Sequence, residues 1–270
     1  MKAIVVLIYT NRLSRSADEL ARGRAEALRN ARKAVELAPD LPIGHGALAE
    51  IYRSELKIEA AAEQYRRVNQ LAGGDPDELR SYAAFQAAMG RTDEALRLAD
   101  RAISLDPLDP WSYGTRALVL LADRRYAEVV RSAEVLKRQS SNLYDFPVVL
   151  GDSLIMLGRF DEARRALAEE NPDDPIRLAS EAVLAARAGD RATAVAIKTK
   201  LEQLYGEAAS YQYALILASL GETDQAIAAL ERAWQIKDPG LLGMKIDSFL
   251  DPVRTDPRFA ALLDKMDFPT

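Results

Sequence analysis

The sequence contains no cysteine and only one histidine, and each shortage removes a class of chemistry. Without thiols the chain has no disulfide framework, no cysteine nucleophile and no cysteine-ligated zinc or iron–sulfur site. The single His45 has neither a second histidine nor a serine-elbow motif near it in sequence, which favours a surface or groove position over a catalytic one. We therefore predict no catalytic residue, no metal site and no cofactor.

Long apolar runs are missing as well. The only continuous run near the start, residues 3–8, is too short to cross a membrane and lacks the cleavage site of a signal peptide. We interpret it as the buried face of a first helix, and its abrupt position at the start is consistent with a fragment of a longer protein. Together with the absence of cysteine, these features favour a cytoplasmic location.

Aromatic residues make up only 7% of the chain, whereas alanine is common, a composition that suits helices packed closely through small side chains. Hydrophobic residues account for 49% and charged residues for 29%, close to the values of globular proteins. The formal net charge of −5 argues against a nucleic-acid-binding domain.

Helix-breaking residues recur at a regular spacing of 34 residues, which is the strongest signal in the sequence. Two sets follow this period: Pro42, Pro76 and Pro110, and Pro39, Gly73 and Pro107. The first set stands where helices are predicted to begin, because proline lacks the amide that the first helical turn leaves unpaired. The second set stands where helices are predicted to end. The spacing therefore predicts a series of helix pairs.

A second pattern marks the turn inside each pair. Residues 89–95, 157–163 and 220–226 share a glycine followed five positions later by an alanine, and residues 188–194 are a looser copy. The glycine is suited to the left-handed conformation that ends the first helix. The alanine is expected where the two helices cross closely, so that a larger side chain at Ala95 would cost about 1–3 kcal/mol.

Two acidic pairs between predicted helices, Glu169–Glu170 and Asp173–Asp174, have the residue type that hard cations prefer. No glycine-turned calcium loop surrounds them, and Asn171, Pro172 and Pro175 place them in a connection between helices. We expect them to stabilise helix ends and to add solubility.

The period and its residues resemble the tetratricopeptide repeat (TPR). The unit from Pro76 carries the pattern most fully, with Tyr82, Ala83, Gly90, Ala95, Ala99, Ala102 and Pro107. The resemblance implies an all-α fold, a right-handed α-solenoid of about seven TPR helix pairs with a C-terminal capping helix. The units lie near residues 1–41, 42–75, 76–109, 110–143, 144–174, 175–206 and 207–237, and residues 238–270 form the cap.

The cap contains a pattern of Asp-Pro dipeptides, at Asp251 and Asp256, which is similar to the end of TPR regions in bacterial signalling and regulatory proteins. In those proteins the TPR region follows an adenylyl-cyclase, winged-helix or kinase domain. This resemblance implies a regulatory context, although no such effector domain is visible in the sequence.

By the same resemblance, the inward faces of the first helices line a concave groove that binds a partner. Its expected residues are Glu50, Arg53, Arg80, Trp111, Gly114, Leu118, Leu121, Val148, Asp152, Ile155, Ile176, Tyr211 and Leu215. The lysine and asparagine residues with which chaperone-binding TPR domains clamp a peptide carboxylate are absent from these positions. Beyond residue 110 the groove is mostly apolar, and Trp111 and Tyr211 are its natural aromatic anchors.

Three functions remain open at this point. The first is a non-catalytic protein-interaction scaffold that binds a peptide or helix of a partner protein in the apolar groove. The second is a self-associating structural module, whose groove is filled by its own tail or by a neighbouring copy. The third is a small-ligand binder or enzyme that uses the inward carboxylate of Asp152.

Overall fold

The protein is described by a computed structural model that covers residues 17–71, 74–139 and 146–268. These residues form 14 α-helices and three short 3₁₀-helices, with no strand among them, as the all-α prediction requires. Six helix pairs follow a single helix, α2 (Ala17–Leu37). The pairs are α3 (Pro42–Ser54) with α4 (Ile58–Leu71), α5 (Pro76–Ala88) with α6 (Thr92–Leu105), α7 (Pro110–Ala122) with α8 (Tyr126–Gln139), α9 (Phe146–Met156) with α10 (Phe160–Leu167), α11 (Pro175–Arg187) with α12 (Arg191–Tyr205), and α13 (Ser210–Ser219) with α14 (Thr223–Ile236).

Proline and aspartate fix the starts of the first helices. Pro76, Pro110 and Pro175 occupy the first turns of α5, α7 and α11, as predicted, and an aspartate precedes each of them. The side chain of Asp109, for example, accepts hydrogen bonds from the backbone amides of Trp111 (3.1 Å) and Ser112 (3.0 Å). Such caps satisfy amides that a helix cannot pair internally.

The turn inside each described pair contains one residue with a positive φ. Gly90, Gly158, Gly189 and Gly221 have φ between 71° and 85°, as the predicted left-handed turn requires. Leu56 and Arg124 take the same position in the pairs that lack the glycine, with φ of 57° and 60°. Because left-handed backbone is unfavourable for residues with a Cβ, these two turns are held by the packing around them.

Small side chains allow the two helices of a pair to approach each other. The alanines of the turn pattern, Ala95, Ala163, Ala194 and Ala226, are fully buried, as the close crossing predicts. One hydrophobic cluster runs through the molecule from Ala49 in α3 to Met266 after α15. A second, smaller cluster joins α2 to α3 through Ala27, Ala31, Ala47, Leu48 and Ile51. Neighbouring pairs thus share one core, as in repeat proteins generally.

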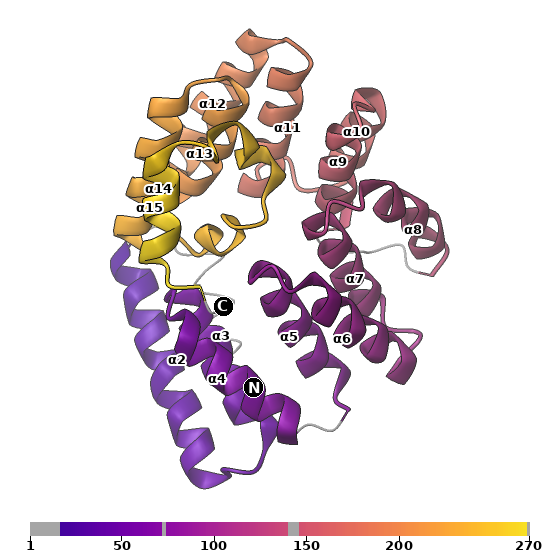
Figure 1. The fold of residues 1–270 in the computed structure, drawn as a ribbon, viewed down its shortest axis with the longest axis vertical. Coiled ribbons are helices and arrows are strands. Elements are labelled where there is room, and N and C mark those ends of the chain that lie inside the picture. Colours follow the sequence, from indigo (N-terminus) through magenta and orange to yellow (C-terminus); the bar gives the residue numbers. More distant parts are fainter. Residues whose placement is uncertain (1–16, 72–73, 140–145, 269–270) are drawn as a thin grey trace.

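The helix pairs stack into an α-solenoid that curves strongly, so that α2 comes to lie near the C-terminal elements (Figure 1). Arg24 of α2 and Asp238, which follows α14, lie close enough to interact electrostatically, and both are buried. The first described helix therefore approaches the end of the last pair. Residues 1–16, which include the apolar run 3–8 and the start of the first predicted unit, lie outside the described residues.

The C-terminal segment folds into η2 (Pro239–Gly243), η3 (Ser248–Val253) and α15 (Pro257–Lys265), which pack against α13 and α14. We call residues 239–256 the tail. The tail also reaches distant repeats: the Lys245 ammonium donates to the Met89 carbonyl (3.0 Å), and Tyr126 and Ser248 share a 2.6 Å hydrogen bond. The segment expected to cap the stack therefore also contacts Met89, which follows α5, and Tyr126 at the start of α8; the sequence did not predict these contacts.

Candidate functional site

A cavity of about 310 Å³ lies between α7, α9 and α11. Most of its lining was predicted from the repeat pattern, and the remainder consists of Thr115, Phe146 and Val149. The described residues that line it are Trp111, Gly114, Thr115, Leu118, Leu121, Phe146, Val148, Val149, Asp152 and Ile176. Among these residues the wall is mostly apolar, and Asp152 is the single ionisable side chain.

Helix α7 supplies one wall of the cavity through residues at helical spacing. Trp111, Gly114, Leu118 and Leu121 follow each other at intervals of three and four, which places them on one face. Trp111 and Leu118 remain 49% and 38% exposed, unusual for large apolar side chains in the middle of a helical stack. A Cβ placed on Gly114 would meet no atom within 4 Å, so this glycine leaves open space in the wall.

Asp152 of α9 is the charged group of the cavity. Its Oδ1 atom is shielded from solvent and has no hydrogen-bond partner. Burial raises the pKa of Asp152 to about 7; the Ser180 hydroxyl lowers this pKa and the Asp247 carboxylate of the tail raises it. A carboxylate that is desolvated and faces another carboxylate is an unfavourable group unless a donor reaches it.

The other predicted residues of α9 divide between the cavity and the core. Val148 lines the cavity and is only 5% exposed. Ile155, which we expected in the groove, is 1% exposed and belongs to the hydrophobic core, because the cavity extends only along the first half of α9. The helix is buried on several faces, so periodicity alone could not tell which face is open.

The polar residues predicted in the first repeats bind one another. The Arg53 guanidinium donates to Glu50 at 2.7 Å, and the buried Tyr65 hydroxyl donates to the same carboxylate. Arg80 pairs with Asp77 and lies 3.4 Å from the Asp109 carboxylate that caps α7. These side chains lie at the predicted positions, but their charges are already neutralised within the chain.

Glu78 is a group of this region that sequence reasoning missed. Its carboxylate lies over Gly46 of α3, where a Cβ would come within 2.4 Å of Glu78 Oε2. Burial, followed by the nearby carboxylates Asp75, Glu50 and Asp77, raises the pKa of Glu78 to about 7. The glycine at position 46 was the available signal, because it leaves room for a side chain of the neighbouring repeat.

At the other end of the groove the tail covers the predicted residues. Tyr211 and Leu215 of α13 are 5% and 8% exposed. The Tyr211 hydroxyl donates to Asp247 of the tail at 3.1 Å, and its ring lies against Gly240, where a Cβ would be 2.7 Å away. The open cavity is therefore bordered by predicted groove residues of α7, α9 and α11, with the exception of Ile155.

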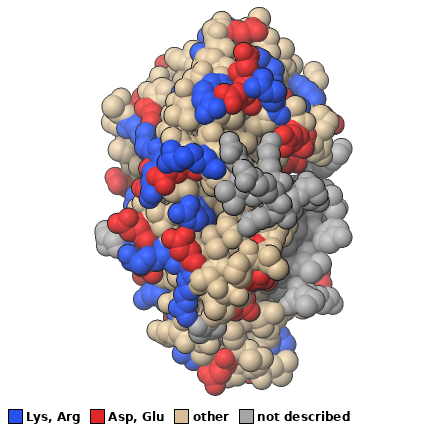
Figure 2. Space-filling model, turned by 90° about the vertical axis from the view of Figure 1, so that its right-hand side faces the viewer, with Lys and Arg blue, Asp and Glu red and all other residues tan. Residues whose placement is uncertain are grey.

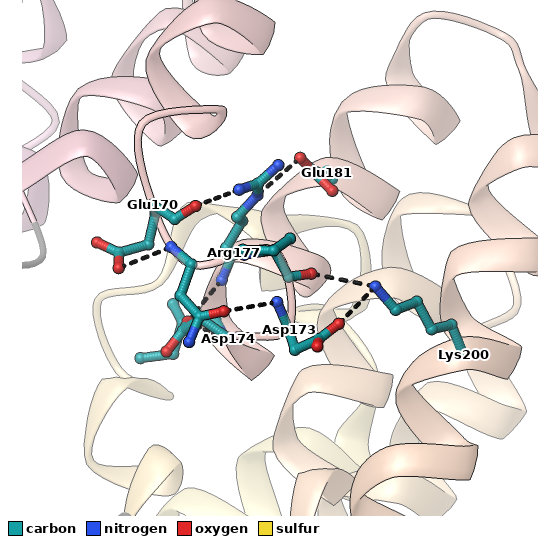
Figure 3. Close-up of polar contacts among 9 residues, drawn as sticks. Glu170, Asp173, Asp174, Arg177, Glu181 and Lys200 are labelled. Carbon is teal, nitrogen blue, oxygen red and sulfur yellow. Dashed lines mark hydrogen bonds and ion pairs between the residues drawn. The ribbon is translucent and has the colours of Figure 1, made fainter.

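The two acidic pairs form part of the connection between α10 and α11 (Figure 3). Asp174 accepts hydrogen bonds from the amides of Ile176 (2.9 Å) and Arg177 (3.0 Å) and so caps α11. Asp173 pairs with Lys200 of α12 at 2.8 Å, and the Glu170 carbonyl accepts from Arg177. These contacts are the helix-end role that the sequence predicted. Within the described ranges, no three His, Cys, Asp or Glu side chains gather as they would around a metal ion.

The charged surface shows no large patch of one sign on the face seen in Figure 2, where basic and acidic side chains are interspersed. Many of them form pairs one helical turn apart, such as Arg159 with Glu162 at 2.7 Å. In addition, none of the described helices combines the length and apolar character that a membrane crossing requires.

The paired helices, their left-handed turns and their shared core define the chain as an α-solenoid of TPR helix pairs. Residues 208–238, which contain α13 and α14, match the sequence model of the tetratricopeptide-repeat family. The comparisons thus support a TPR protein, as the period of the sequence predicted.

Several solved structures have a similar fold. PilF from Pseudomonas aeruginosa is 24% identical, with a TM-score of 0.52 over 76% of this chain and 94% of that chain. A tetratricopeptide repeat protein from Parabacteroides merdae is 19% identical, with a TM-score of 0.57 over 90% of this chain and all of that chain. A chain of the APC/C hetero-tetramer Cut9–Hcn1 is 14% identical, with a TM-score of 0.56; the match covers 98% of this chain and 58% of that chain.

Proposed function

We propose that this protein is a non-catalytic interaction scaffold that binds a peptide or helix of a partner protein in the cavity between α7, α9 and α11. The observation that carries the proposal is the exposure of Trp111 and Leu118 on the wall of an apolar cavity. Large apolar side chains are the usual energetic centres of protein interfaces, and a groove lined by them accepts the apolar face of a helix or an extended segment.

The scaffold role is also supported by the fold. A solenoid presents its first helices along a continuous inner surface, and the rigid shared core holds that surface in shape. The Cut9–Hcn1 hetero-tetramer is one assembly that contains a chain of this fold. From this assembly we apply to the present chain only the general role of binding another protein.

The proposal is tested by substituting leucines of similar exposure inside and outside the cavity. Leu118→Glu, combined with Trp111→Ala, places a charge in the cavity wall, whereas Leu157→Glu changes a leucine that is 40% exposed and does not line the cavity. Affinity capture followed by quantitative mass spectrometry is expected to lose the specific partner with the first variant and to keep it with the second. Retention of that partner by a folded double variant would falsify the proposal.

A second candidate function is self-association, and the tail favours it. The tail already packs on Tyr211 of α13 through Asp247 and Gly240, which supports a role for this segment as an occupant of the groove. The tail of a second copy would fit the same surface if the two chains exchanged tails. Light scattering over a range of concentrations distinguishes the candidates, because exchange requires a mass that rises with concentration and a scaffold for other proteins does not.

The regulatory setting is part of the same proposal. We infer that the solenoid is the regulatory part of a cytoplasmic bacterial signalling protein, on the resemblance of its Asp-Pro pattern at Asp251 and Asp256. The reading frame that encodes the chain provides the test. An adenylyl-cyclase, winged-helix or kinase domain in the same frame supports this setting, and a complete gene without one contradicts it.

A further inference from the structure

We propose that Asp152 is the charge anchor of the cavity, and that the partner segment which docks there carries a lysine or arginine between apolar residues. This inference rests on the proposed function, since it specifies the partner of the same site.

The first argument is that Asp152 lacks a counter-charge. Its Oδ1 atom has no hydrogen-bond partner and almost no accessible surface. The charged group that acts on it is Asp247 of the tail, which is another carboxylate, and no lysine or arginine of the described residues acts on it. The Asp152 carboxyl is only partly ionised near neutral pH, and a cationic ligand would stabilise its charged form, so the cavity favours a cation at this point.

The second argument concerns what an occupant of the cavity must satisfy. A wholly apolar segment would enclose the unpaired Oδ1 atom of Asp152 without giving it a donor, and an unsatisfied buried acceptor opposes binding. A segment with an ammonium or guanidinium group supplies both the donor and the opposite charge. The carboxylate thus selects among apolar partners by penalising those that lack a cation.

The third argument is the shape of the wall. The aliphatic stem of a lysine or arginine needs apolar surface beside it when its charged end is buried. Leu118, Val148 and Phe146 supply that surface. The cavity lies at the lower end of the size range of ligand pockets, so it fits a few side chains and not a whole helix.

The experiment uses a display library of random linear peptides, selected on the whole protein. Bound peptides are sorted by their response to Gly114→Phe, a substitution intended to fill the cavity from a position where an added Cβ meets no atom within 4 Å. Cavity-dependent peptides are then measured by titration calorimetry against the wild type, Asp152→Asn and Asp161→Asn. Asp161 is the matched control, because its side chain is 87% exposed on α10, away from the cavity.

The expected peptides contain a basic residue flanked by apolar ones. Asp152→Asn should lower their binding affinity about tenfold or more, whereas Asp161→Asn should leave the affinity unchanged. Replacing the basic residue by norleucine produces the same loss in the wild type and no further loss in Asp152→Asn, as a pair in direct contact requires. Circular dichroism confirms folding of the variant, and Asp152→Ser serves as a second replacement.

Two other results overturn the inference in different ways. Peptides that depend on the cavity but bind Asp152→Asn as well as the wild type refute the charge anchor and leave the proposed function intact. A selection without any peptide sensitive to Gly114→Phe refutes both the anchor and the peptide-binding groove.

Discussion

Arg124 and Asp251 form a two-point ion pair, with both N···O distances at 2.6 Å, although 127 residues separate them in sequence. Arg124 stands in the turn between α7 and α8, where four of the other pairs have a glycine, and Asp251 belongs to η3 of the tail. The pair thus joins the third helix pair to the C-terminal segment. Together with the bond between Tyr126 and Ser248, it fixes the tail across the curve of the solenoid.

The contribution of this ion pair to stability is expected to be small. Both side chains are partly exposed, at 46% and 34%, so water and salt screen the attraction. A double-mutant cycle of Arg124→Ala and Asp251→Ala should give a coupling of about 1 kcal/mol or less, which decreases at high salt. A coupling several times larger and independent of salt would show that the pair is buried in solution.

Glycine-to-alanine substitution should have opposite effects on stability at a positive-φ turn and inside a helix. A Cβ on Gly158 or on Gly114 meets no atom within 4 Å, but Gly158 has a φ of 71° and Gly114 lies inside α7. Gly158→Ala should therefore lower the free energy of unfolding by about 1 kcal/mol, and Gly114→Ala should raise it by about 0.5–1 kcal/mol. Urea unfolding of both variants measures the two effects, and a common sign would contradict the backbone argument.

The raised pKa of Asp152 predicts a stability effect that depends on pH. Because the folded-state pKa of about 7 lies above the ordinary 3.8, the protonated form is favoured in the fold, and stability is lost as the pH rises towards 7. Asp152→Asn removes this loss. We expect the variant to be more stable than the wild type by about 4 kcal/mol at pH 8 and nearly equal to it at pH 4.

Denaturant unfolding at the two pH values measures this difference. Other groups that titrate in the range, such as Glu78 with its pKa of about 7, contribute equally to both proteins and cancel. A gain for Asp152→Asn that is the same at both pH values would mean that Asp152 does not titrate as a buried acid.

We predict that one added methyl group at Gly240 disturbs the packing of the tail against α13. A Cβ at Gly240 would lie 2.7 Å from the ring of Tyr211, which packing and the hydrogen bond to Asp247 hold in place. Gly240→Ala should therefore destabilise the docked tail by about 1–3 kcal/mol. Hydrogen exchange of the η3 amides should speed up while that of α5 and α6 stays unchanged. Unaltered exchange in η3 would show that the tail is not seated on Tyr211.

Local rules made most of the fold predictable from the sequence. Proline at positions 76 and 110 determined the starts of helices, and glycine at 90 and 158 determined the turns, because each acts on its own backbone. The residues of α7 that line the cavity were expected from the resemblance to the TPR family. The left-handed conformation of Arg124 was not predictable, because tertiary contacts impose it on a residue that disfavours it.

The rest of the site depends on contacts between distant parts of the chain. The tail covers Tyr211 through Gly240 and Asp247, and nothing in the spacing of those residues indicates on which helix they rest. Likewise Ile155 shares a predicted face with Asp152 but lies in the core, since α9 is packed on several sides. Pattern alone therefore defined the candidate groove but not the part of it that stays open.

The central claim, that a partner docks between α7, α9 and α11, is tested most directly by site-specific photo-crosslinking in cells that produce the protein. A photoreactive amino acid replaces Leu118 in the cavity wall or, as the control, Leu157, which is equally exposed outside it. We predict that position 118 cross-links one partner protein and that position 157 does not. Equal cross-linking from both positions, or cross-links from 118 only to a second copy of this chain, would contradict the account.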